Sequence, residues 1–549
     1  MEMTYPSEAI FWYIQELTAG IIAESGIPSD RYHLGKIIHR SLKDAPDHIL
    51  QIDGANGEKD TFKSALERSK QCAKAFRSLG LKYQDVIVIM APNHINLVIP
   101  MYAALFNGIQ VACVDMTLGV TELQDSFKCN TPKAVFCQSS NVETVREALK
   151  LLNNPAQIIV FDKNEQYESF HQFLEKYGQD TAENDFKPAD FDPAITNAIL
   201  MPTSGSTGTP KTAVLTHKNI LVGFPHVLSV CTNFPTPFKI TIVISPIQWV
   251  SAVFQFIMGP ILRFTRVQTS SSLTAEHVRY LINKYKPEYT ITSPTFLTTL
   301  IMPGREKCDF TSFQWLMVGG SNVTEKLIED TKKLMPKTHV RICYGITEGS
   351  GMIFNFAYAP AGSVGFPTGH FQYKLTDPTT DEEILTHNLT GELRLKGPAL
   401  FKCYYNNPVM TKATFDDDGW FKTGDLFYRD EHHNYYYVDR LKLLLKYRNH
   451  QVSPVEIESV IIKHPGVLDV AVTGIPDPEC GDLPVALVIL EDGHKVTAQE
   501  IKDLVKESLT DTKQLRGGVF FLKEFPTTST SKLDRVKLKE LAKILSIGQ

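Results

Sequence analysis

A run of small hydroxyl-bearing residues and glycines closes on a lysine, a combination that suits a polyphosphate. The run, TSGSTGTPK at 203–211, lies between two apolar segments at 198–201 and 213–215. Glycines let a ligand approach the backbone, hydroxyls and amides supply donors, and the lysine supplies positive charge. The spacing differs from the Walker pattern, and a serine- and threonine-rich surface turn is the alternative. The candidate phosphate-binding residues are Thr203, Ser204, Gly205, Ser206, Thr207, Gly208 and Lys211.

Five further segments carry polar and aromatic residues that could complete a nucleotide site. They are YGITE at 344–348, GELRLKGP at 391–398, GWFKTGD at 419–425, YVDRLKLLLKYRNHQVSPVEIE at 437–458 and SKLDR at 531–535. A tyrosine offers a flat face, a threonine next to a glutamate can hold a phosphate and a hard cation, and an aspartate can accept hydroxyl groups. Singly, each has an ordinary structural alternative: a core tyrosine, a turn aspartate or a solvated lysine.

In this order, the motifs resemble those of the adenylate-forming enzymes: acyl-CoA synthetases, 4-coumarate-CoA ligases and beetle luciferases. The resemblance extends over essentially the whole chain. The chain is most similar to the insect luciferase-like branch, judging by YYNNP at 404–408 and QLRGG at 514–518. The resemblance implies an ATP- and Mg²⁺-dependent enzyme that converts a carboxylic acid into an acyl-adenylate and then transfers the acyl group to coenzyme A.

The resemblance also implies a role for each motif residue. Tyr344 would stack on adenine, Asp425 would accept both ribose hydroxyls with Arg440 as its partner, and Glu348 would bind the metal. Lys532 would bridge the substrate carboxylate and the α-phosphate, and Lys446 would serve the second half-reaction from another face of the small domain. The implied catalytic residues are Lys532, Lys446, Thr347 and Glu348, and Gly320 and Gly345 join the nucleotide site.

The acyl pocket implied by the resemblance is lined mainly by apolar or small residues. Its residues would be Trp249, Val250, Val253, Gly319 and Met352. Such a lining suits an apolar acid, so we expect a medium- or long-chain fatty acid as the substrate.

Several positions depart from the family pattern. Thr212 and Ser531 stand where glycines usually flank the two active-site lysines, which removes backbone freedom. Ile342-Cys343 replace a polar residue and a glycine before the adenine tyrosine. Gln248-Trp249 replace a histidine-containing pair, and Gly223 stands where luciferases tend to carry an arginine. The last two departures argue against strong bioluminescence.

Two other functions stay open. The first is a luciferase that oxidises the adenylate with O₂. The second is a non-catalytic acyl- or nucleotide-binding paralogue, which Thr212 and Ser531 favour. The motif lysines, Thr347, Glu348, Asp425 and Arg440 are all present, and this argues against a non-catalytic protein.

Composition excludes several classes. The 549 residues carry 56 Lys and Arg against 61 Asp and Glu, a formal net charge of −5, which argues against a general nucleic-acid binder. Nine scattered cysteines without a C-x-x-C pair argue against a disulfide frame or a structural zinc site. The acidic N-terminus lacks signal-peptide features, which argues against secretion. Members of the family that the chain resembles are often peroxisomal, whereas this C-terminus lacks a Ser-Lys-Leu-type address, so we expect a cytoplasmic or peroxisomal protein, and a monomer.

The elements that must position these residues form two domains. Short apolar strands at 86–90, 134–137 and 158–161 alternate with helices such as 62–79, which predicts an α/β fold with mixed or parallel sheets. The uncharged stretch 240–262 is expected to form a strand, a loop and a helix instead of a membrane span. We expect a large adenylating domain at 1–440, a hinge at Asp439-Arg440, and a small mobile α+β domain at 441–549.

The small domain has its own helix and strand signals. Ser453, Pro454 and Glu456 predict a capping box at a helix start, and 465–466 (Pro-Gly) ends that helix. Strands are expected at 467–472, 485–490 and 519–522, and a second capped helix is expected from Thr497.

Overall fold

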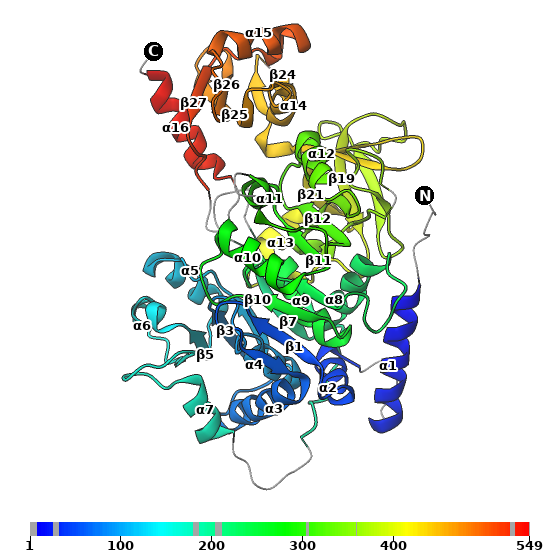
Figure 1. The fold of residues 1–549 in the computed structure, drawn as a ribbon, viewed down its shortest axis with the longest axis vertical. Coiled ribbons are helices and arrows are strands. Elements are labelled where there is room, and N and C mark those ends of the chain that lie inside the picture. Colours follow the sequence, from blue (N-terminus) through cyan, green and yellow to red (C-terminus); the bar gives the residue numbers. More distant parts are fainter. Residues whose placement is uncertain are drawn as a thin grey trace.

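The computed structural model describes residues 8–25, 32–178, 186–203, 211–302, 307–357, 359–448, 450–527 and 533–547. Figure 1 shows a large body that contains most of the chain and a small body above it, which contains α14, α15 and the strands around them. The C-terminal helix α16 runs along one side of the small body, and α1 lies on the flank of the large one.

The first sheet of the large body is almost entirely parallel. Its strands follow the order β13 (His339–Cys343), β12 (Trp315–Gly319), β11 (Tyr289–Thr292), β9 (Ile240–Ile242), β10 (Thr265–Gln268), β1 (Ile49–Asp53) and β2 (Lys59–Thr61). Only β2 pairs antiparallel. Parallel strands need crossover connections, which helices provide here, and their side chains are buried on both faces.

The second sheet is mixed. Its strands follow the order β20 (Cys403–Tyr404), β8 (Lys211–Thr216), β7 (Asn197–Thr203), β4 (Gln110–Cys113), β3 (Val86–Met90), β5 (Ala134–Cys137) and β6 (Gln157–Val160). Strands β7 and β8 pair antiparallel with Thr203 opposite Lys211, so both ends of the phosphate-binding run lie at one place. Residues 204–210 themselves are outside the described part.

A third, antiparallel sheet carries the end of the large body. Its order is β18 (Gln372–Thr376), β19 (Gly391–Lys396), β21 (Phe421–Arg429) and β22 (Tyr435–Arg440). Two short hairpins precede it: β14 (Gly345–Ile346) with β15 (Gly351–Met352), and β16 (Phe354–Asn355) with β17 (Phe366–Pro367). The 3₁₀ turn η5 (Thr347–Gly349) lies between β14 and β15.

Helices cover the sheets of the large body. They are α1 (Ala9–Ser25), α2 (Leu34–Asp44), α3 (Phe62–Ser78), α4 (Val98–Asn107), α5 (Val120–Asn130), α6 (Val142–Leu151), α7 (Phe170–Tyr177), α8 (His217–Gly223), α9 (Val250–Ile261), α10 (Ala275–Tyr285), α11 (Pro294–Ile301), α12 (Glu325–Leu334) and α13 (Pro408–Thr414). The main core joins α2, α3, α4 and α9 to apolar side chains of both seven-stranded sheets, so these layers form one packed unit.

The small body is an α+β unit. The 3₁₀ turn η6 (Leu441–Leu443) leads into a sheet of β24 (His450–Val452), β23 (Leu445–Tyr447), β26 (Gly481–Leu490) and β25 (Val467–Asp477), and β27 (Gly518–Leu522) pairs parallel with β26. Helices α14 (Pro454–Ile461), α15 (Ala498–Ser508) and α16 (Arg535–Ile547) accompany it. Its apolar residues form clusters separate from those of the large body.

The structure confirms the α/β character and most of the predicted elements. The strands at 86–90 and 134–137 have the predicted bounds, and the uncharged stretch divides into β9 and α9. Within the described ranges, no helix has the length and hydropathy needed to cross a membrane. The capping box at Ser453 is only half formed, because Ser453 accepts from the Glu456 amide whereas the Glu456 side chain pairs with Lys513.

Candidate functional site

One large cavity, of about 2920 Å³, lies where the large and small bodies meet. Fourteen of the predicted catalytic, binding and hinge residues line it. They are Thr203, Lys211, Trp249, Val250, Gly319, Gly320, Tyr344, Gly345, Thr347, Glu348, Met352, Asp425, Asp439 and Arg440. These residues come from β7, β8, the start of α9, β12, the segment 344–352 with the β14–β15 hairpin, and the antiparallel sheet, so the tertiary fold brings together segments more than 200 positions apart.

Asp425 forms the centre of a polar group on the cavity wall. Asp425 is 2% exposed, and it stands directly opposite Arg440 across the β21–β22 ladder. Arg440 Nε lies 3.2 Å from Asp425 Oδ1, and the Tyr344 hydroxyl donates to Asp425 Oδ2 at 2.6 Å. The three predicted nucleotide residues therefore form one contiguous polar group.

Burial and charge act in opposite directions on this carboxyl group. Burial raises the pKa of Asp425, while the Arg440 guanidinium and the Tyr344 hydroxyl lower it, and the net shift is upward. Burial also raises the pKa of Tyr344, reinforced by the neighbouring Asp425 carboxylate. A desolvated carboxylate whose oxygens face a cavity is well suited to accept two hydroxyl groups from a ligand.

Glu348 and Lys211 are linked through a residue that the sequence analysis did not single out. The Tyr404 hydroxyl donates to Glu348 Oε1 at 2.8 Å, and Lys211 Nζ lies 5.0 Å from the centroid of the Tyr404 ring. Tyr404 thus connects the η5 turn to the end of the phosphate-binding run. It belongs to the YYNNP segment at 404–408, one of the two segments that carry the resemblance to the insect luciferase-like branch.

The residues around η5 fit a magnesium ion. Thr347 and Glu348 both line the cavity, and Glu348 Oε1 is the oxygen that Tyr404 holds. Mg²⁺ in nucleotide sites is commonly bound by one or two carboxylates and by phosphate oxygens and waters. One carboxylate beside a hydroxyl meets that requirement.

The predicted hinge lies at the junction of the two bodies. Asp439 is fully buried, its Oδ2 accepts from Ser453 Oγ at 2.6 Å, and the Val455 amide lies 3.4 Å from the same oxygen. Asp439 therefore ties the last strand of the large body to the start of α14. Three residues on, the Lys442 ammonium lines the cavity, where burial lowers its pKa and Arg440 lowers it further.

The two predicted catalytic lysines occupy different situations. Lys446 is exposed on β23 and is not part of the cavity lining, and its amide donates to Asp482. Lys532 and Ser531 lie outside the described residues. The flanking residues Thr527 and Leu533 pair with each other and line the cavity, so both ends of the Lys532 segment reach the site.

The part of the cavity next to α9 carries several apolar side chains. Trp249, Val250 and Met352 line it as predicted, whereas Val253 is buried in the core and does not line it. The helix phase explains the difference, because Val250 and Phe254 lie on the face of α9 next to the cavity. Further lining residues that the sequence analysis did not name include Phe224, Val227, Ser245, Ser251 and Phe254.

Gly319 and Gly223 have specific packing reasons to be glycine. A Cβ on Gly319 would lie 2.3 Å from the carbonyl oxygen and 2.7 Å from the sulfur of Cys343, so Cys343 packs tightly here. A Cβ on Gly223 would lie 2.8 Å from the carbonyl oxygen of Ser350. An arginine at position 223 would therefore require the backbone at Ser350 to move.

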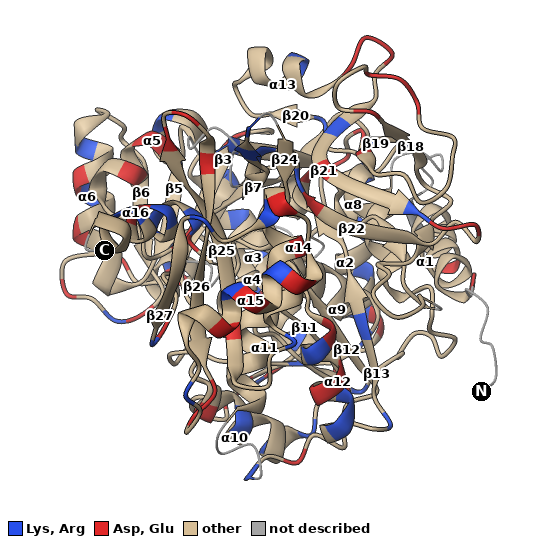
Figure 2. Cartoon of the chain, turned by 90° about the horizontal axis from the view of Figure 1, so that it is seen from above, with Lys and Arg blue, Asp and Glu red and all other residues tan. Residues whose placement is uncertain are grey.

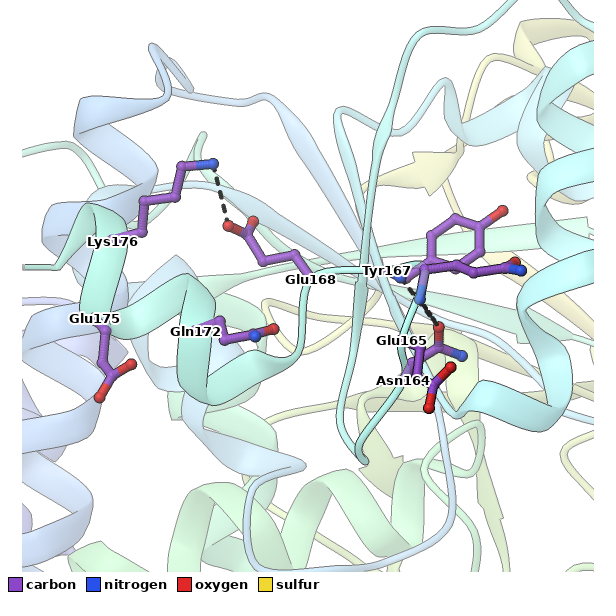
Figure 3. Close-up of a pocket in the computed structure, with 8 residues that line it drawn as sticks. Asn164, Glu165, Tyr167, Glu168, Gln172, Glu175 and Lys176 are labelled. Atoms are coloured by element: carbon purple, nitrogen blue, oxygen red, sulfur yellow. Dashed lines mark hydrogen bonds and ion pairs between the residues drawn. The ribbon is translucent and has the colours of Figure 1, made fainter.

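A second cavity, of about 560 Å³, lies at the surface of the large body near α7 (Figure 3). Its lining consists of Asn164, Glu165, Gln166, Tyr167, Glu168, Gln172, Glu175 and Lys176, and the Lys176 ammonium lies 3.3 Å from Glu168. None of the motif residues lines this cavity, so the candidate site is the larger one.

Comparison with known proteins agrees with this geometry. The AMP-binding enzyme family profile matches residues 38–405, and the AMP-binding enzyme C-terminal domain profile matches residues 456–532. A luciferin 4-monooxygenase of Photuris pensylvanica is 33% identical over 495 residues, which cover 87% of this chain and 89% of that protein. A probable CoA ligase of Humulus lupulus is 27% identical over 529 residues, 94% of this chain and 92% of that protein.

A solved structure shares the fold. An anthranilate CoA ligase in complex with anthranoyl-AMP superposes with a TM-score of 0.85, at 20% sequence identity, over 95% of this chain and 99% of that one. At this identity the likeness establishes the common fold.

Proposed function

Because this chain belongs to the AMP-binding enzyme family of adenylate-forming proteins, we propose that it is an acid-thiol ligase that uses ATP, Mg²⁺ and coenzyme A. The observation that carries the proposal is the joint presence, on one cavity, of the Asp425–Arg440–Tyr344 group and of an apolar wall. A cavity with a polar nucleotide end and an apolar end suits a reaction that joins AMP to an apolar acid.

In the first half-reaction, a carboxylate oxygen of the acid attacks the α-phosphorus of ATP. A new oxygen–phosphorus bond forms and the bond to pyrophosphate breaks. Asp425 holds the ribose, Tyr344 contacts the adenine, and Lys211 and Thr347 hold phosphate oxygens. Lys532 offsets the repulsion between the carboxylate and the phosphates. Magnesium held by Glu348 would neutralise phosphate charge.

In the second half-reaction, the thiol of coenzyme A attacks the acyl carbon and displaces AMP. We propose that residues 441–549 rotate about Asp439 and Arg440 relative to residues 1–440, so that Lys446 faces the site in place of Lys532. The exposed position of Lys446, away from a cavity that both ends of the Lys532 segment reach, supports two working orientations.

We propose a medium- or long-chain fatty acid as the substrate. The apolar side chains of Trp249, Met352 and Phe254 on the cavity wall support this choice. We further propose that the protein works as a monomer in the cytoplasm or the peroxisome.

The test is a pyrophosphate-release assay over a panel of fatty and aromatic acids, with and without coenzyme A. We expect release with one class of apolar acid and formation of its thioester when coenzyme A is present. An absence of release with every acid would favour a non-catalytic binding protein.

The Lys532→Ala variant separates the two half-reactions. We expect the rate of adenylate formation to fall by about 10² or more, because a fixed ammonium that stabilises charge at the α-phosphoryl group is lost. Thioester formation from pre-made acyl-adenylate should persist, and single-turnover measurements of each step check both expectations. An equal loss in both steps would contradict this role for Lys532.

A luciferase is the second candidate, supported by the 33% identity to the Photuris luciferin 4-monooxygenase. The packing of Gly223 against Ser350 argues against it, because an arginine there would collide with the backbone. A luminometer reading with luciferin, ATP and O₂ decides between the two, and sustained light emission would favour the luciferase.

A further inference from the structure

The strand that carries Asp425 is irregular at the point where this residue lies. β19 and β21 pair regularly at Glu392 with Leu426 and at Arg394 with Lys422, yet three residues of β21, 423–425, oppose Leu393 alone. A bulge of this kind bends a strand and changes where its side chains point. The direction of the Asp425 carboxylate therefore depends on how the bulge is held.

Gly424 lies in the middle of the bulge and has a φ of +69°. A Cβ at this position would meet no atom within 4 Å, so the requirement for glycine comes from the backbone angle and not from crowding. Glycine adopts this angle without a steric cost, so this residue type allows the bulge, while its position depends on the groups bonded around it.

Two side chains hold the bulge. The Thr423 hydroxyl donates to the Leu393 carbonyl at 2.7 Å and accepts from the Asp425 amide at 3.1 Å. Glu392 Oε1 accepts from the Gly424 amide at 3.1 Å. The backbone amides of Gly424 and Asp425 are thus bonded to side chains instead of to the backbone of the neighbouring strand.

Glu392 is itself firmly placed. It is 6% exposed, and its Oε2 accepts from Arg394 Nε at 3.2 Å. Arg394 is 3% exposed and also pairs with Asp416 at 3.2 Å and with Asp381. A buried carboxylate requires such a partner. The ion pairs of Arg394 therefore fix the position of the Glu392 carboxylate, whose other oxygen accepts the hydrogen bond from the Gly424 amide.

We propose that Glu392 is a positioning residue for the nucleotide, which acts by holding the Gly424 amide so that Asp425 is presented to the ribose hydroxyls. The proposal rests on the proposed function, because it takes Asp425 as the acceptor of those hydroxyls. Glu392 acts through the bulge, and Thr423 supports the same bulge from the other side.

Equilibrium binding of two nucleotides tests the proposal. Isothermal titration calorimetry compares ATP with 2′,3′-dideoxy-ATP, which lacks the hydroxyls that Asp425 would accept. We expect the wild-type protein to bind ATP at least 10-fold more tightly than the dideoxy compound. Glu392→Ala should weaken ATP about 10-fold and change the affinity for the dideoxy compound less than about 2-fold, because the contact it supports is absent there.

Variants of the same network provide controls. Glu392→Gln keeps an oxygen for the Gly424 amide and should retain most of the discrimination. Asp381→Asn removes an exposed partner of Arg394 and should leave both affinities unchanged. If Glu392→Ala does not fold, Thr423→Val takes its place, with Thr423→Ser as the rescue, because only the hydroxyl bonds the Asp425 amide.

Two results would overturn the proposal, and they are distinguishable. An equal loss of affinity for both nucleotides in Glu392→Ala would mean that Glu392 only stabilises the fold. Equal affinity of the wild-type protein for both nucleotides would instead remove the role of Asp425, and with it this part of the proposed function.

Discussion

The two ends of the large cavity, the proposed nucleotide end and the proposed acyl end, are built in different ways. At the nucleotide end, Asp425 is bonded to Tyr344 and paired with Arg440, and Glu348 is bonded to Tyr404. At the acyl end, the apolar side chains of Trp249, Val250 and Met352 line the cavity wall. Hydrogen bonds demand particular atoms at particular distances, whereas apolar packing demands only volume.

This difference explains why the sequence predicts the residues of one end better than those of the other. The nucleotide residues lie in short motifs, because one changed side chain would leave a buried partner unsatisfied. The acyl residues lie on one face of a helix and on strand ends, where Val253 falls outside the lining while Phe254 lies within it. Four variants test how far the two ends differ.

The largest effect is expected from Asp425→Asn. The amide keeps the size of the side chain but removes its negative charge. The Arg440 guanidinium then has no charge partner at this position, and the Tyr344 hydroxyl loses its charged acceptor. We expect kcat/KM for ATP to fall about 10²-fold, with a much smaller change in KM for the acid. Steady-state kinetics with each substrate varied in turn measure both values. A comparable rise in KM for the acid would show that the two ends are not independent.

Gly223→Arg addresses the end of α8, which leads into the cavity-lining residues Phe224 and Val227. Because a Cβ would lie 2.8 Å from the Ser350 carbonyl oxygen, we expect a loss of about 1–3 kcal/mol in the free energy of unfolding and a lower acid-dependent activity. Thermal unfolding measures the loss. Gly223→Ala should reproduce most of it, and Lys218→Arg, at an exposed position of the same helix, should not. An unchanged Tm in both Gly223 variants would contradict the packing argument.

Asp469, on the small-domain wall of the cavity, predicts a pH dependence. Burial, with a smaller contribution from Glu458, raises the pKa of this carboxyl to about 6, against the opposing effects of the Val470 amide and Lys326. Because the folded pKa exceeds the unfolded one, the stability linked to this proton is fully present below about pH 4 and is lost as the pH rises through about 6.

The variant Asp469→Asn should therefore stabilise the protein at pH 7.5 and have a clearly smaller effect at pH 4.5. We expect a gain of roughly 1–2 kcal/mol at the higher pH. Unfolding by denaturant at both pH values, with Asp492→Asn as the exposed control, measures the difference. Equal shifts at both pH values would show that the Asp469 proton is not responsible.

The smallest effect is expected from Trp249→Ala. The loss of the indole enlarges the apolar end of the cavity and leaves the nucleotide contacts in place. We expect the ratio of kcat/KM between longer and shorter acids to change several-fold, a magnitude typical of hydrophobic pockets, with KM for ATP unchanged. Competition between two acids of different length measures this ratio, and an unaltered ratio would place the chain-length limit elsewhere.

The sequence by itself determined the order of the motifs, the strands at 86–90 and 134–137, the two capped helices of the small body and the polar residues of the nucleotide end. These depend on local periodicity, on turn and cap chemistry, and on side-chain types that one reaction requires. For Glu392 and Thr423, the only sequence signals were the surrounding GELRLKGP and GWFKTGD motifs.

Only the tertiary structure decided how these residues meet. The pairing of β21 with β22 places Asp425 opposite Arg440, and the bulge opposite Leu393 gives Glu392 a partner in the Gly424 amide. The contact of Tyr404 with Glu348 joins segments 56 positions apart. Strand register and bulges depend on long-range pairing and on the burial of both faces of a sheet, which no local pattern encodes.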